Sequence, residues 1–127
     1  MEDMGLSKVL IVDDSEANIR IISAMLREKY EIHFATSGKD CLKLAEEGDP
    51  DLILLDILMP DLNGIEVCKA LKQNPKTSGI PVVFVSALSA ASSRYEGLDA
   101  GGFDYLIKPF TAKTALETVK KHIRRKV

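Results

Sequence analysis

Apolar residues gather in five short runs along the chain, at residues 8–12, 31–35, 52–55, 80–85 and 103–107. Three of these runs, at 8–12, 52–55 and 80–85, show no alternation with polar residues. A short run of this kind is typical of a strand buried on both faces of a parallel sheet. The run at 31–35 alternates apolar and polar residues, which predicts a strand at the edge of the sheet.

Helical spacing of apolar residues fills the stretches between these runs. Ile19, Ile22 and Leu26 share one face, for example, and Thr111 precedes a similar stripe as a capping residue. The pattern predicts helices over residues 15–30, 37–48, 63–74, 89–100 and 111–123. Residues 89–100 are rich in Ser and Ala, so we expect the fourth helix to be weak.

Strands and helices alternate along the whole chain, and their connections are short. This order builds a parallel sheet that is covered by helices on both faces. A length of 127 residues suits one domain and is too short for two. We therefore expect a single α/β domain over residues 1–127, with a doubly wound five-stranded sheet and a core at about 7–125.

Composition narrows the class of protein further. The net charge of −2 does not indicate binding to nucleic acid or to an anionic membrane. No apolar stretch is long enough to cross a bilayer. The N-terminus lacks the basic and apolar regions of a signal peptide, so we expect a cytoplasmic protein. The basic residues at 120–126 complement the negative end of the last helix dipole, which is a sufficient reason for them.

Cys41, Cys68 and His33 form no metal or catalytic motif. Both cysteines fall in helical patterns, and we interpret them as small buried residues. His33 lies on the predicted edge strand without a second ligand at metal spacing, so we interpret it as a surface or structural residue.

Polar side chains stand where four of the predicted strands end. Asp13 and Asp14 follow the first strand, Asp56 the third, Ser86 the fourth and Lys108 the fifth. Because parallel strands finish at the same edge of a sheet, we expect all five side chains to meet there. Helix capping would explain one acid after the first strand but not a pair. Three carboxylates that lie close together cannot all stay ionised without a nearby positive charge.

A bound divalent cation would offset this repulsion. Carboxylate and water oxygens are the ligands that Mg²⁺ prefers, so the three acids predict a magnesium site. Lys108 adds a point charge suited to phosphate oxygens, and Ser86 adds a hydroxyl donor. Together these groups predict a phosphoryl-transfer site. Asp56 lies on the most central strand and is the expected nucleophile, which would give an aspartyl phosphate.

The ordered set of motifs resembles the receiver domain of bacterial two-component response regulators, chemotaxis receivers included. The likeness covers nearly the whole chain, and each motif is weak alone but specific in this order. The motifs are Asp13-Asp14, Asp56 with Met59-Pro60 and Gly64, Ser86-Ala87, Tyr105 three residues before the lysine, and Lys108-Pro109-Phe110. The resemblance implies a flavodoxin-like (βα)5 fold with strand order 2-1-3-4-5.

The same resemblance implies how the acids work. Asp56 accepts a phosphoryl group from the phosphohistidine of a partner kinase. Asp14 and Asp56 bind Mg²⁺ together with the backbone carbonyl of Leu58, while Asp13 acts mainly through water. Lys108 contacts the phosphoryl group and the Asp56 carboxylate.

A conformational switch is also implied by the resemblance. Ser86 moves to bond a phosphoryl oxygen, and Tyr105 turns into the space that Ser86 leaves. The bond between Lys108 and Pro109 is expected to be cis.

The implied partners lie upstream and downstream in a signalling chain. A sensor histidine kinase or a phosphotransfer protein supplies the phosphoryl group. An output domain or a downstream protein binds the face formed by residues 89–100, 103–107 and 111–123, and a phosphorylation-dependent dimer is left open.

No direct contact with nucleic acid or membrane is expected. Such a domain catalyses its own phosphorylation and slow dephosphorylation and is not a conventional turnover enzyme. The sequence leaves open whether the chain stands alone or belongs to a larger regulator.

Three alternatives share some of these features. A flavodoxin-like protein would bind FMN, but without a metal ion Asp13 and Asp14 would repel its phosphate. A phosphatase of the haloacid-dehalogenase type usually carries a second Asp two residues after its nucleophile, where this chain has Leu58. A receiver-like module that never takes up phosphate is disfavoured, because all five polar positions are filled. Leu58 and Leu88 are apolar where many receivers have a polar group, and this bears on the lifetime of the phosphoryl group.

Overall fold

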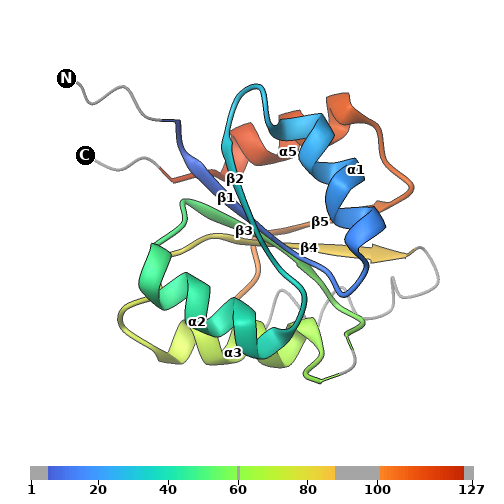
Figure 1. Ribbon diagram of the computed structural model, residues 1–127. Coiled ribbons are helices and arrows are strands. Elements are labelled where there is room, and N and C mark those ends of the chain that lie inside the picture. Colours follow the sequence, from blue (N-terminus) through green and yellow to red (C-terminus); the bar gives the residue numbers. More distant parts are fainter. Residues whose placement is uncertain (1–5, 60, 88–100, 125–127) are drawn as a thin grey trace.

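A five-stranded parallel sheet forms the centre of the protein (Figure 1). The computed structural model describes residues 6–59, 61–87 and 101–124. The strand order is β2-β1-β3-β4-β5, which confirms the order implied by the resemblance. The strands are β1 (Lys8–Val12), β2 (Glu31–Ala35), β3 (Leu52–Asp56), β4 (Val82–Ala87) and β5 (Asp104–Lys108).

Among the residues that the structure describes, two helices cover each face of this sheet (Figure 1). The helices are α1 (Glu16–Leu26), α2 (Gly38–Gly48), α3 (Gly64–Gln73) and α5 (Ala112–His122). α1 packs beside α5 on one face, and α2 packs beside α3 on the other. The predicted fourth helix at 89–100 lies outside the described residues. None of the helices that the structure describes is long and apolar enough to span a membrane.

The unbroken apolar run of β3 is explained by burial on both faces. Ile53 and Leu55 belong to the core cluster under α2 and α3, whereas Leu52 and Leu54 belong to the cluster under α1 and α5. All four side chains are fully buried. Side chains alternate between the two faces of a strand, so each face of a central strand needs apolar residues.

Side-chain caps start the described helices close to the carboxyl ends of the strands. The caps accept a backbone N–H from the third residue after them: Ser15 from Asn18, Ser37 from Asp40, Asn63 from Glu66 and Thr111 from Thr114. These bonds satisfy donors that a helix cannot satisfy internally. They also fix the turns that carry the predicted site.

Some boundaries differ from the predicted ones. The first helix ends at Leu26 rather than near residue 30, because Lys29 and Tyr30 both donate their N–H to the Leu26 carbonyl in a closing turn. The fourth strand begins at Val82 rather than Ile80. Pro81 has no N–H for the ladder, although its carbonyl accepts from Ile53 at 2.9 Å.

Two residues of the basic C-terminal region pair with other groups of the protein. His122 lies 2.9 Å from a carboxylate oxygen of Asp104, and Arg124 donates to the Pro50 carbonyl at 2.9 Å and pairs with Asp49. These contacts agree with a structural role for His122 and Arg124. Cys41 and Cys68 are buried as predicted, and burial raises the pKa of Cys41 to about 12 and that of Cys68 to about 11.

Candidate functional site

Three carboxylates meet at the carboxyl edge of the sheet. Asp13 and Asp14 follow β1, and Asp56 ends the neighbouring strand β3. One oxygen of each carboxylate lies within 4.8 Å of the others. The sequence prediction that these acids converge is therefore confirmed among the residues that the structure describes.

Lys108 brings the balancing positive charge from β5. Its Nζ lies 3.5 Å from Oδ2 of Asp13 and 3.8 Å from Oδ2 of Asp56. The Lys108–Pro109 bond is cis, as the resemblance implies. One ammonium thus faces two acids, and the more exposed Asp14 completes the cluster on the solvent side.

Asp13 is buried and held from two directions. Its Oδ1 accepts the N–H of Ser15 at 2.9 Å, and its Oδ2 accepts from the Asn18 side chain at 3.3 Å. These bonds come from the first turn of α1, so the start of this helix fixes the orientation of the acid. Sequence reasoning missed Asn18; the signal was a polar residue in the first turn, beside the apolar stripe that begins at Ile19.

Asp56 is only 7% exposed, which makes its charge costly. Burial is the largest influence and raises the pKa of Asp56 to about 6, with Asp13 and Asp14 adding repulsion. Lys108 and the Leu58 N–H, which donates to Oδ1 at 3.2 Å, lower the pKa but do not outweigh burial. Asp56 is therefore ionised at neutral pH but easily neutralised.

This donor set fits a hard divalent cation. The three acids offer oxygen ligands at one spot. Asp13 and Asp56 are buried, whereas Asp14 is exposed and water can reach it. Mg²⁺ favours such a site because it keeps several of its own waters. The cluster can therefore hold a metal ion.

Ser86 and Tyr105 lie on the neighbouring strands. Val85 pairs with Asp56 in the ladder, so Ser86 follows directly at the same edge, and its side chain is buried. Tyr105 is buried too, and its ring packs on Phe84 with centroids 5.3 Å apart. The predicted movement of these two residues stays a prediction. Leu58 is 63% exposed, whereas Pro60 and Leu88 lie outside the described residues.

Comparison with protein families identifies the family of this chain. The model of the response regulator receiver domain matches residues 9–120, which include all the polar positions described above. The chain belongs to this family. Membership decides against the flavin-protein and phosphatase alternatives.

Individual relatives agree with the receiver domain assignment. The chain is 44% identical to the response regulator PleD of Caulobacter vibrioides over 104 residues, which are 81% of this chain and 23% of PleD. It is 39% identical to a probable cyclic di-GMP phosphodiesterase of Vibrio cholerae over 126 residues, which are 99% of this chain and 29% of that protein. The receiver chain thus spans about a quarter of the length of these relatives.

Solved structures show the same receiver fold. A putative response regulator from Chloroflexus aurantiacus superposes with a TM-score of 0.89 at 32% identity, over 94% of this chain and 99% of that one. The chemotaxis protein CheY4 of Vibrio cholerae gives a TM-score of 0.87 at 29% identity, over 94% of this chain and all of that one.

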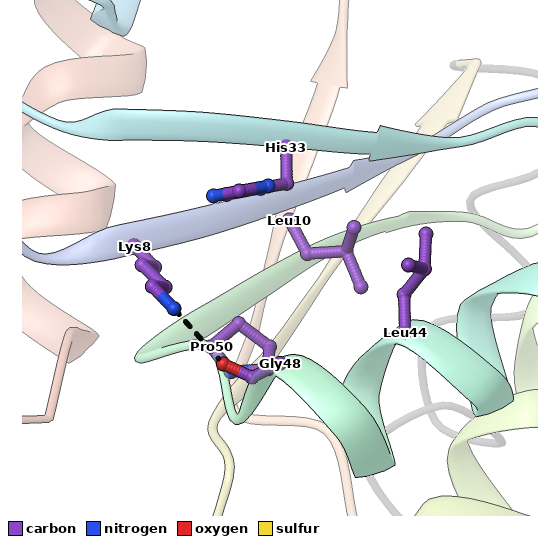
Figure 2. A pocket seen from close by; sticks show the side chains of 6 residues that line it. All are labelled: Lys8, Leu10, His33, Leu44, Gly48 and Pro50. Atoms are coloured by element: carbon purple, nitrogen blue, oxygen red, sulfur yellow. Dashed lines mark hydrogen bonds between the residues drawn. The ribbon is translucent and has the colours of Figure 1, made fainter.

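A small hollow on another part of the receiver takes no part in the acid cluster. It measures about 50 Å³ and lies between β1, β2 and α2 (Figure 2). Lys8 at its rim donates to the Gly48 carbonyl at 3.3 Å. His33 also lines it and is paired with Glu31 at 2.6 Å, which agrees with a structural role. Lys8 begins β1 whereas Asp13 follows its end, so the hollow is remote from the carboxylates.

The raised pKa of Asp56 predicts a stability that depends on pH. The folded state holds the proton up to about pH 6, whereas an unfolded Asp releases it near 3.8. Tighter proton binding by folded Asp56 therefore stabilises the fold. This contribution is fully present below the unfolded pKa and is lost as pH rises through about 6. In Mg²⁺-free buffer, Asp56→Asn is expected to be more stable than wild type at pH 7.5, by about 1–3 kcal/mol, and the difference should shrink towards pH 4.

Urea unfolding followed by circular dichroism checks this at several pH values. Asp40→Asn makes the same substitution at an exposed position on α2 and serves as the control. A difference between Asp56→Asn and wild type that does not change with pH would contradict the assigned cost of the Asp56 charge.

Proposed function

We propose that this receiver domain accepts a phosphoryl group on Asp56 from the phosphohistidine of a histidine kinase or a phosphotransfer protein. The observation that carries this proposal is the placement of the Lys108 ammonium within 4.0 Å of both Asp13 and Asp56, beside the exposed Asp14. An ion pair that served stability alone would not need three acids for one cation. The chain catalyses its own phosphorylation and is not a conventional turnover enzyme.

The reaction is an in-line displacement at phosphorus. A carboxylate oxygen of Asp56 forms a new bond to phosphorus as the bond from phosphorus to the donor imidazole nitrogen breaks, and the imidazole leaves with that electron pair. The Leu58 N–H holds one oxygen of Asp56 during this step, while Lys108 lies close enough to balance charge on the incoming phosphoryl group.

Mg²⁺ would be held by Asp13, Asp14 and Asp56, with the Leu58 carbonyl added on the strength of the family resemblance. When bound, the ion supplies positive charge for the phosphoryl oxygens. The residues themselves supply its site: Asp13 is fixed by Ser15 and Asn18, and the ion relieves the repulsion that burial makes costly.

The output of the domain follows from Ser86 and Tyr105. Ser86 moves and donates a hydrogen bond from its hydroxyl to a phosphoryl oxygen. Tyr105, which packs on Phe84, turns into the space that Ser86 leaves. β5 and α5, together with residues 89–100 outside the described part, carry the signal to an output domain or partner in the cytoplasm. A dimer formed on phosphorylation is one such output.

An apolar hollow next to Lys108 suits the phosphoryl donor. It measures about 190 Å³ and lies between α1 and the loop after β5. Ile21, 56% exposed, and Phe110 line it, with Lys108 and Pro109 at the same site. An amphipathic helix of the donor would bury its apolar face here and bring its histidine to the acids.

Asp56→Asn is expected to abolish phosphoryl uptake and leave the fold intact, because the amide has nearly the same shape but is not a nucleophile. Mass spectrometry after incubation with acetyl phosphate and Mg²⁺ measures the uptake. Asp40→Asn should label like wild type. Labelling of Asp56→Asn at the wild-type rate and position would refute the assignment of the nucleophile.

Leu58 is expected to prolong the lifetime of the aspartyl phosphate. Hydrolysis needs a water in line with the leaving carboxylate oxygen, and the exposed Leu58 side chain offers no group to hold it. Leu58→Asn should speed decay about tenfold, which is about 1.4 kcal/mol off the barrier. Leu88→Glu is expected to act in the same direction.

Decay of the phosphorylated protein after removal of the donor tests this. Leu58→Met keeps an apolar side chain of similar volume and should decay like wild type. If Leu58→Asn, Leu88→Glu and wild type all decay at one rate, the leucines do not control access of water.

A further inference from the structure

The start of α2 is held by a residue from another loop. Ser37 caps this helix, and its hydroxyl accepts the N–H of Asp40 at 3.1 Å. The N–H groups of Gly38 and Lys39 donate instead to Asp61, to Oδ1 at 3.0 Å and to Oδ2 at 3.2 Å. Asp61 belongs to the loop that joins β3 to α3. One carboxylate therefore connects the loop after the nucleophile to α2.

The charged form of Asp61 accepts these two hydrogen bonds. Hydrogen bonds from backbone N–H groups, that of Gly38 above all, hold the pKa of Asp61 below its usual range. The positive end of the α2 dipole favours the same charged form. The connection is thus present at neutral pH, although the side chain is exposed to water.

Close packing joins the same two segments. A Cβ atom added to Gly38 would lie 2.9 Å from Leu62 Cβ and 2.9 Å from Val67 Cγ2. These contacts are too short for any side chain, so glycine is needed where the loop meets the helix. The hydrogen bonds of Asp61 and the packing of Leu62 therefore fix the middle of the loop on α2.

A hydrogen bond between its two ends closes the same loop beside the nucleophile. The Gly64 N–H donates to the Ile57 carbonyl at 2.7 Å, and a Cβ on Gly64 would lie 2.3 Å from the Asp56 carbonyl oxygen. Leu58 lies between Ile57 and Asp61, which are both held in place, and its N–H donates to Oδ1 of Asp56. A shift of the loop would therefore move the donor that orients the Asp56 carboxylate.

We propose that Asp61 is a positioning residue of the phosphoacceptor site, which fixes the loop on α2 and so sets the Leu58 backbone beside Asp56. The inference rests on the proposed function. Loss of Asp61 is expected to weaken Mg²⁺ binding and to slow phosphoryl uptake in a protein that is still folded. α2 thereby becomes part of the support of the site, although it contributes no acid to the cluster.

A comparison of Asp61→Ala with Ser37→Ala tests this proposal. Both variants remove acceptors from the start of α2, but only Asp61→Ala releases the loop. Calorimetric titration with Mg²⁺ should show an affinity about tenfold lower for Asp61→Ala and unchanged for Ser37→Ala. In Mg²⁺-free buffer, the amide NMR resonance of Leu58 should move in Asp61→Ala and keep its position in Ser37→Ala. Uptake from acetyl phosphate should follow the Mg²⁺ affinity.

Asp61→Asn keeps the side-chain volume and one acceptor oxygen, so it tests the same bonds if the alanine variant does not fold. It should also lower the Mg²⁺ affinity. Equal effects of the Ser37 and Asp61 variants would overturn the proposal, because stability of α2 would then be the cause. An unchanged affinity and an unmoved Leu58 resonance in both Asp61 variants would overturn it too. Failure of wild type to take up phosphoryl would instead count against the proposed function.

Discussion

Repulsion among three carboxylates at one edge of the sheet is the constraint on which the site depends. Burial disfavours the charge on Asp56, and Asp13 and Asp14 add to that cost. One ammonium, that of Lys108, lies 3.5 Å from Asp13 and 3.8 Å from Asp56 and offsets only part of it. The folded protein thus keeps an excess of negative charge that a bound divalent cation would offset. The close carboxylates lower the stability of the fold at this edge, and they form a binding site for a cation.

The rest of the fold holds these charges in place. Apolar side chains on both faces of β3 fix the strand that ends in Asp56, and the first turn of α1 fixes Asp13 through Ser15 and Asn18. Gly64 lets the loop after β3 close against the backbone of the nucleophile. Without this rigid frame the acids would separate and ionise independently. The frame is what turns mutual repulsion into affinity for a cation.

Much of this arrangement could be predicted from local sequence patterns. The unbroken run at 52–55 indicated a strand buried on both faces, and the acids at strand ends indicated a common edge because parallel strands share direction. The strand order came from family resemblance rather than from the residues. The bond from Gly38 to Asp61 was missed, because it joins residues 23 positions apart and depends on how two loops pack. The end of α1 at Leu26 and the start of β4 after Pro81 were misplaced, since single hydrogen bonds decide such boundaries.

The central claim is that the acid cluster stores a repulsion that a divalent cation relieves. The most direct measurement is the melting temperature of wild type in chelator and in millimolar Mg²⁺, at pH 7.5 and at pH 5. The account predicts that Mg²⁺ raises the melting temperature, and that the rise is larger at pH 7.5 because a proton on Asp56 competes with the ion at pH 5. A melting temperature that Mg²⁺ leaves unchanged at both pH values would contradict it.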